Sequence, residues 1–260
     1  MRIVVVTLFP EFVEHAVQFG VLGRALERGV LGVETVNPRQ FATDAHKTVD
    51  DRPYGGGPGM VLKAEPLRLA LLEAERRVPQ ARRVYLAADG IPFTQRKAAE
   101  FAELAELVLV AGRYEGVDER FVDACIDESV SVGDVVLSGG DIPALAVVDA
   151  VARLLPGTLG DAESAVQESF TDGLLDWPHY TRPEVWSGVE VPPVLTGGNH
   201  AAIARWRLKQ SLGRTWLRRP DLLQAKVLSR EERKLLDEYQ AEHGCDATRV
   251  GTQPLREGEK

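Results

Sequence analysis

The sequence predicts an α/β fold built on a parallel sheet, followed by a smaller helical C-terminal domain. Ile3 to Leu8 is a short apolar run of the kind found in parallel strands that are buried on both faces. Similar runs alternate with segments of helical periodicity as far as Leu155, and this alternation is typical of parallel α/β sheets. After Pro156-Gly157 the pattern changes, so we expect a different architecture in the last part of the chain.

The predicted elements of the first part follow from apolar periodicity and from the turn residues that bound each run. The expected strands cover residues 3–8, 31–36, 83–87 and 107–111. The expected helices cover residues 11–19, 22–28, 64–77, 95–104 and 119–126. The polar segment 44–51 leads into Arg52 to Met60 (RPYGGGPGM), whose glycines and prolines exclude a helix or a strand. We interpret this run as a substrate-facing loop, with an ordinary surface loop as the alternative.

The rest of this part is organised around Ser131 to Leu155. A short apolar segment, Val135 to Leu137, is expected to be a strand, and Ser138-Gly139-Gly140 follows it. Asp141 is the expected N-cap of a helix with Pro143 in its first turn. The buried face of that helix is formed by Ala144, Val147, Val148, Val151 and Leu155. This arrangement predicts a ligand lying against bare backbone, although a tight turn between two core elements would have the same pattern.

The charges near this turn indicate which ligand it accepts. Asp134 and Asp141 flank it. Other acids lie just upstream, namely Asp118, Glu119, Asp123, Asp127 and Glu128. An acidic field disfavours anions, and the sequence lacks both the P-loop and the G-x-G-x-x-G fingerprint. We therefore predict a neutral or cationic small molecule, held beyond the carboxyl ends of strands near Tyr85-Leu86, Gly112 and Leu137–Gly140.

The composition of the chain limits which classes of protein it can belong to. The net charge is −8 and the apolar fraction is 44%, which fits a globular protein without a uniformly basic surface. No apolar run approaches the length of a membrane span, so we expect no membrane association. Cys125 and Cys245 lie far apart, which favours free thiols and a cytoplasmic location. The scattered histidines suggest no transition-metal site.

The C-terminal part contains a basic segment. Its predicted helices cover residues 201–212 and, after a capping box formed by Ser229 and Glu232, residues up to Glu242, with a frayed tail from Thr248. No acidic residue lies between Val191 and Pro220. The cations there are Arg205, Arg207, Lys209, Arg214, Arg218 and Arg219, interleaved with Trp206 and Trp216. This pattern predicts contacts with a nucleic-acid backbone, and a merely basic surface is the alternative.

Together these motifs resemble the bacterial tRNA (guanine-N1)-methyltransferases of the knotted SPOUT class. The matching motifs are LFPEF (8–12), TVDDRPYGGGPGM (48–60), AGRYEGVDER (111–120), SVGDVVLSGGDIPA (131–144), GLLDWPHYTRPEVW (173–186), VPPVLTGGNH (191–200) and RWRLKQSLGRTWLRRP (205–220). The resemblance implies a deep trefoil knot in an S-adenosylmethionine-binding domain (residues 1–159), a linker (160–172) and a helical tRNA-binding domain (173–260). It also implies a homodimer with shared active sites.

The resemblance further implies methyl transfer from S-adenosyl-L-methionine to N1 of the guanosine at position 37 of tRNA, 3′ of the anticodon, with the anticodon stem-loop as partner. It implies cofactor contacts at Tyr85, Leu86, Gly112, Tyr114, Glu115, Ser131, Val132, Gly133, Asp134, Val135, Val136, Leu137, Gly139 and Gly140. It implies tRNA contacts at Gly59 and at the six cations named above.

The resemblance also implies catalytic residues. Arg153 matches the family's arginine, and Glu168 stands where the family often has Asp, with Asp172 as a nearby rival. In this interpretation Glu168 removes the guanine N1 proton and Arg153 stabilises charge on the guanine oxygen or holds Glu168 in place. The family is linked to Mg²⁺ as well, with Glu115 as a candidate ligand.

The same sequence is compatible with three alternative functions. The first is a related SPOUT methylase that acts at a different RNA position, and the second is an RNA-binding protein without catalytic activity. The third is a dinucleotide oxidoreductase, against which the missing G-x-G-x-x-G counts.

Overall fold

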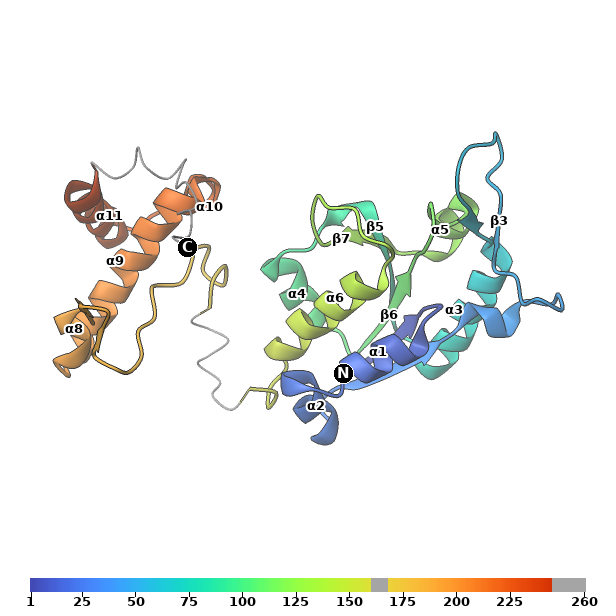
Figure 1. Cartoon of the computed structure of the whole chain (residues 1–260), viewed down its shortest axis with the longest axis horizontal. Coiled ribbons are helices and arrows are strands. Elements are labelled where there is room, and N and C mark those ends of the chain that lie inside the picture. Colours follow the sequence, from blue (N-terminus) through green and yellow to red (C-terminus); the bar gives the residue numbers. More distant parts are fainter. Residues whose placement is uncertain (160–167, 245–260) are drawn as a thin grey trace, which may run out of the picture. The chain divides into compact units, whose positions relative to one another are not determined.

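The structure is a computed structural model that describes residues 1–159 and 168–244. The chain divides into two compact units, Met1–Ala165 and Val166–Lys260, which are considered one at a time (Figure 1). Most of the predicted linker (160–167), Cys245 and the tail from Thr248 lie outside the described residues.

Unit 1 contains the predicted parallel sheet. Its strands are β1 (Arg2–Val6), β2 (Gly32–Val36), β5 (Arg82–Pro92), β6 (Glu106–Ala111) and β7 (Glu128–Ser131). The spatial order is β2-β1-β6-β5-β7, and every neighbouring pair is parallel. Because β1 and β6 lie in the interior of the sheet, both are apolar and buried after their first residues, Arg2 and Glu106.

Helices cover both faces of this sheet. They are α1 (Pro10–Ala16), α2 (Gly20–Glu27), α3 (Ala64–Arg77), α4 (Gln95–Ala102), α5 (Glu119–Cys125) and α6 (Asp141–Leu154), with a 3₁₀ turn η1 (Pro38–Phe41). Successive strand side chains point to opposite faces. Ile3 and Val5 therefore belong to one apolar core with α1, α2, α4 and α6, whereas Val4 and Val6 belong to another with α3 and α5.

A small antiparallel hairpin, β3 (Asp50–Asp51) with β4 (Val61–Leu62), carries the glycine-rich loop between them. The chain following β3 projects from the rest of the unit (Figure 1). As predicted, residues 52–60 form neither helix nor strand, although the preceding polar segment does contribute the two residues of β3.

Unit 2 is mainly helical in its described part. It contains a short hairpin, β8 (Val185–Trp186) with β9 (Val189–Glu190), and the helices α8 (Pro193–Thr196), α9 (His200–Arg218), α10 (Pro220–Ala225) and α11 (Arg230–His243). The predicted capping box of Ser229 and Glu232 is confirmed at the start of α11. A small apolar core forms from Leu174, Leu212, Leu235 and Leu236.

Several predicted boundaries are wrong, for local reasons. Val135 to Leu137 is an exposed loop instead of a strand, and Val136 is 98% exposed. The strand before the glycine pair is β7. Apolar runs did not predict it, because three of its four residues are serine or glutamate. Strand β5 continues past Asp89-Gly90 to Pro92, with a shift of register against β7 between Leu86 and Ile91. Helix α9 runs six residues beyond the predicted end at 212, to Arg218.

Asp141 is also not the N-cap of α6. Gly140 takes that position, and Asp141 is the first helical residue, with its side chain turned to other partners. Within the described residues, no helix has both the length and the apolarity needed to cross a membrane.

Candidate active site

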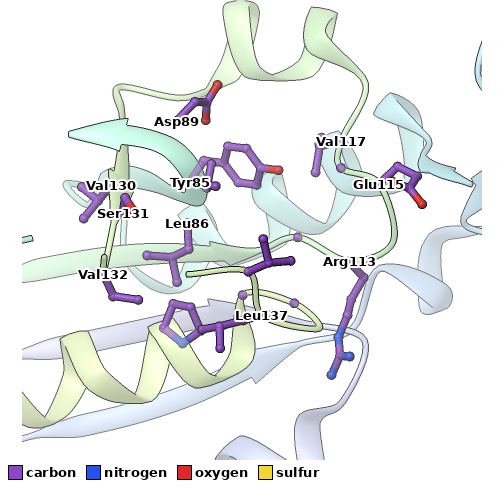
Figure 2. A pocket seen from close by; sticks show the side chains of 18 of the residues that line it. Tyr85, Leu86, Asp89, Arg113, Glu115, Val117, Val130, Ser131, Val132 and Leu137 are labelled. Carbon is purple, nitrogen blue, oxygen red and sulfur yellow. The ribbon is translucent and has the colours of Figure 1, made fainter. Parts of the chain in front are cut away.

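A cavity of about 480 Å³ lies in unit 1 at the carboxyl ends of β6 and β7 and beside the middle of β5, where its register shifts (Figure 2). This is the edge at which ligands bind to open parallel sheets. Its walls come from three segments, namely 85–89 at the turn in β5, 112–119 after β6, and 130–143 from β7 into α6. The predicted convergence of three chain segments therefore holds, although the third strand ends at Ser131 and not at Leu137.

The structure brings together almost all of the predicted cofactor residues around this cavity, and Asp134 alone among them does not line it. Sequence reasoning missed other lining residues, namely Ala87, Ala88, Asp89, Arg113, Gly116, Val117, Glu119, Val130 and Pro143. Arg113, Gly116, Val117 and Glu119 lie within the motif AGRYEGVDER, which could have identified them.

Glycine backbone closes one side of the cavity. The Gly140 N–H donates to the Gly112 carbonyl at 2.8 Å. A Cβ atom at Gly140 would lie 2.7 Å from the Cα of Ala111, and one at Gly112 would lie 2.9 Å from the Tyr85 hydroxyl. Only glycine permits the backbone at Gly140 to approach Ala111 and the backbone at Gly112 to approach the Tyr85 side chain so closely, so the pocket geometry depends on these two positions.

Arg113 ties this turn to the start of the chain through what we call the Arg113 clamp, formed by Thr7, Phe9, Arg113 and Asp141. The Asp141 carboxylate is 2% exposed and accepts hydrogen bonds from Arg113 Nε at 2.8 Å and from the Thr7 hydroxyl. Arg113 Nη1 donates to the Ser138 carbonyl at 3.1 Å, and the guanidinium lies 4.3 Å from the centre of the Phe9 ring. The clamp therefore fixes the loop before Gly139 against the Gly112 turn.

The charges around the cavity differ from those predicted. Asp127 and Glu128 precede or begin β7, at the opposite end of the strand, and pair with Arg83, Arg82 and Lys97. Asp118 pairs with Arg120. The carboxylates that do line the cavity are Asp89, Glu115 and Glu119, with Arg113 as a cation committed to Asp141. The local field is acidic, as expected, but it comes largely from other residues.

Tyr85 is the pocket side chain whose ionisation is most perturbed. Burial raises the pKa of its phenol to about 12, and the negative charges of Asp89 and Glu119 act in the same direction. Tyr85 therefore stays neutral throughout the physiological range and can offer a hydroxyl but no anion.

Arg153 does not reach this cavity from its place in the fold. It lies in the last turn of α6, whereas Pro143 in the first turn lines the pocket. Ten residues of helix separate them by about 15 Å along the axis. Within one chain, the structure does not bring Arg153 to the predicted cofactor residues.

Glu168 and Asp172 both line a second cavity, of about 410 Å³, within unit 2. Asp172 Oδ1 accepts the backbone N–H of Leu174 at 3.2 Å, which ties that carboxylate to its own turn. Arg207 stands on the wall of the same cavity, 4.7 Å over the ring of Trp177. Both candidate bases thus line the same cavity.

The basic segment is not one-signed in three dimensions. Helix α11 places Glu238 against Arg205 at 2.8 Å and Glu242 against Lys209 at 2.6 Å, and Asp221 pairs with Arg219 at 2.7 Å. The acidic residues that neutralise this segment lie after residue 220 in the sequence. Their pairing with the arginines and the lysine depends on the fold, so the sequence alone could not predict it. Arg207, Arg214 and Arg218 have no ion pair among the described residues.

The expected Mg²⁺ ligand Glu115 lines the cofactor cavity, but it belongs to no cluster of metal-binding side chains among the described residues. Its side chain packs against Gly59, and the described residues contain no group of three or more side chains suited to hold a metal ion. The described residues therefore do not form a magnesium site, and no step of the reaction is assigned to Mg²⁺.

Comparisons with known proteins agree with the pocket and its motifs. The model of the tRNA (Guanine-1)-methyltransferase TrmD family matches residues 1–225. The chain is 57% identical to a tRNA (guanine-N(1)-)-methyltransferase of Chromohalobacter salexigens, over 93% of each chain. It is 59% identical to one of Methylococcus capsulatus, over 93% of this chain and 97% of the other. The chain therefore belongs to the tRNA (guanine-1)-methyltransferase TrmD family.

Proposed function

We propose that the protein is a tRNA methyltransferase of the cytoplasm, which transfers a methyl group from S-adenosyl-L-methionine to N1 of the guanosine at position 37. The observation that carries the proposal is a backbone-lined pocket bordered by carboxylates, in a chain that belongs to the TrmD family. Family membership also supports the trefoil knot and the roles expected for the two domains.

The pocket suits this cofactor chemically. S-adenosylmethionine supplies an activated methyl group on a sulfonium, and it carries no phosphate. Asp89, Glu115 and Glu119 favour a cation, whereas a nucleotide phosphate would meet repulsion there. Leu86, Val132 and Leu137 offer apolar surface, and the exposed backbone amides and carbonyls provide hydrogen bonds for an adenine edge.

In the proposed reaction, the protein aligns guanine N1 with the methyl group and accepts the N1 proton. Alignment of two bound reactants contributes about 7–11 kcal/mol. Glu168 takes the proton, and its place on a cavity wall together with Arg207 and Trp177 supports this role. Arg153 stabilises charge on the guanine oxygen or orients Glu168.

We further propose that a homodimer completes each site. The separation of about 15 Å between Arg153 and the pocket-lining Pro143 of the same helix supports this, since a second copy can bring its own Arg153 to the pocket. Exposed apolar residues near the pocket, including Val136 at 98% and Ile142 at 51%, are suited to be covered by such a partner.

The direct test is methyl transfer from labelled S-adenosylmethionine to two tRNAs that differ only in G or A at position 37. We expect 1-methylguanosine with G and no product with A. Equal labelling of both tRNAs would favour a related methylase with another target. No labelling with either, together with no cofactor binding by calorimetry, would favour the non-catalytic RNA-binding protein.

Mixed dimers test the shared site. Chains with Arg153→Ala and chains with Gly140→Ala are each expected to be inactive alone. If Arg153 acts on the partner's pocket, co-expression yields dimers with one complete site and recovers activity. Absence of recovery in mixed dimers verified by two affinity tags would assign Arg153 to the pocket of its own chain.

A further inference from the structure

The glycine-rich loop of the β3–β4 hairpin carries an aromatic side chain that the proposed mechanism does not use. Tyr54 is 99% exposed. A tyrosine can bury 150–250 Å² or so in a core or an interface, so a fully exposed one leaves that contact area unused. Single exposed apolar residues are common on surfaces, and the case for Tyr54 therefore depends on the way its loop is built and anchored.

The loop has a specified shape. Gly55, Gly56, Gly57 and Gly59 have φ values of +83°, +77°, +117° and +81°, a region that other residues rarely adopt. Pro53 and Pro58 restrict the backbone further. These glycines permit a backbone path that other residues rarely follow, and Tyr54 is the large exposed side chain on that path.

The base of the loop is joined directly to the cofactor pocket. The Glu115 N–H donates to the Met60 carbonyl at 3.0 Å, and the Leu62 N–H donates to the Gly116 carbonyl at 2.9 Å. The Glu115 side chain packs so closely on Gly59 that a Cβ there would lie 2.2 Å from its Oε1 atom. Tyr54 is three residues from Asp51 in β3, so its Cα lies within roughly 11 Å of the hairpin strands. These strands are bonded to the segment that lines the pocket.

The surroundings of Tyr54 are cationic on two sides. Arg52 is exposed two residues away. Arg120 is exposed and pairs with Asp118, whose backbone N–H donates to the Leu62 carbonyl at the base of the hairpin. Arg52 and Arg120 are therefore cations close to this loop, and Asp118 partly neutralises the second of them.

We propose that Tyr54 is a positioning residue that stacks on an unpaired nucleobase of the RNA substrate, next to the pocket in which the methyl group is transferred. This inference rests on the proposed function, because it needs a single-stranded RNA loop at this site. Aromatic side chains bind unpaired bases by stacking, independently of base identity. Arg52 and Arg120 then lie beside the adjoining phosphates.

The test compares Tyr54→Ala and Tyr54→Phe with the wild-type protein, using the anticodon stem-loop and S-adenosylhomocysteine as an unreactive cofactor. We expect Tyr54→Ala to weaken RNA binding by about 5- to 150-fold, the range measured for loss of one stacked base. Tyr54→Phe keeps the ring and should bind within about twofold of the wild-type protein. Leu72→Ala removes another exposed apolar side chain, on α3 of unit 1, and should leave RNA binding unchanged.

Two further measurements separate stacking from other causes. Cofactor affinity and the melting temperature should be unchanged in all three variants, because the Tyr54 side chain is in water. Stem-loops with 5-iodouridine in place of single loop uridines should cross-link to Tyr54 under ultraviolet light, and peptide mass spectrometry locates the adduct. RNA binding by Tyr54→Ala equal to wild type, or cross-links that form only elsewhere, would overturn the inference while the methylation assay still succeeds. Failure of the wild-type protein to bind the RNA at all would overturn both proposals.

Discussion

Replacing Asp141 by Asn tests the Arg113 clamp. The carboxylate is 2% exposed and interacts with two donors from distant parts of the chain, Thr7 and Arg113. Asn is isosteric, but it replaces one acceptor oxygen by an N–H group and leaves the Arg113 guanidinium without a counter-charge. Removing one partner from a buried ion pair costs about 3–5 kcal/mol. Because the Arg113 side chain is still 23% exposed, we expect the lower end, about 3 kcal/mol.

Thermal unfolding followed by circular dichroism measures this loss. Unit 1 spans Met1–Ala165, a size at which each kcal/mol lowers the melting temperature by about 2–4 °C, so Asp141→Asn should melt about 6–12 °C lower. Glu65→Gln is the matched control, because it breaks a 2.9 Å pair with Arg68 that is exposed to water and should shift the melting temperature little.

The clamp also predicts a functional loss. Without the Asp141 charge, Arg113 no longer holds the Ser138 carbonyl, and the loop that walls the pocket loosens. Cofactor affinity should therefore fall together with stability, and calorimetry on the folded variant at low temperature measures it. A melting temperature and a cofactor affinity both equal to those of the wild-type protein would refute the assigned role of Asp141.

Three further outcomes are expected. Gly140→Ala should abolish cofactor binding in calorimetry, because its Cβ would lie 2.7 Å from backbone, whereas Gly32→Ala, whose Cβ meets its first neighbour at 3.7 Å, should bind normally. Glu168→Gln should lower the single-turnover methylation rate by about 10²- to 10⁴-fold with cofactor affinity unchanged, and a near-normal rate would transfer the role to Asp172. The hydrogen bonds from Arg83 hold the pKa of Asp127 below its ordinary value of 3.8, so this pair stabilises the fold above about pH 4 and the effect is lost as the pH falls through the lowered value. Asp127→Asn should accordingly be less stable than wild type at pH 7 in urea titrations, with the difference shrinking in acid, and a constant difference would contradict this.

The sequence predicted elements whose side chains carry a clear periodic signal. The bounds of α3, Ala64–Arg77, match the prediction, and the apolar runs of β1 and β6 located the centre of the sheet. The capping box at Ser229 was recognisable because its two side chains bond to backbone N–H groups only three residues apart. In each case the signal lies within a few residues of the feature it predicts.

Features made by contacts distant in sequence were missed. Asp141 has the residue type of an N-cap, but Thr7 and Arg113, from elsewhere in the chain, take its carboxylate. The acids that neutralise Arg205 and Lys209 come from α11. The apolar run from Val135 to Leu137 suggested a buried strand, but in the structure it is a loop with exposed side chains. Periodicity predicted the helix that carries Arg153, but it cannot specify whether a second copy brings that residue to a pocket.

The closure of the pocket by backbone at Gly112, Gly139 and Gly140 has a consequence for inhibition. A compound that hydrogen-bonds to the backbone there binds to atoms that are present in every type of residue. A resistant variant would have to add a side chain at these positions, and each added Cβ meets atoms at 2.4 to 2.9 Å. A mutation that gives resistance to such a compound would therefore also reduce the activity of the enzyme.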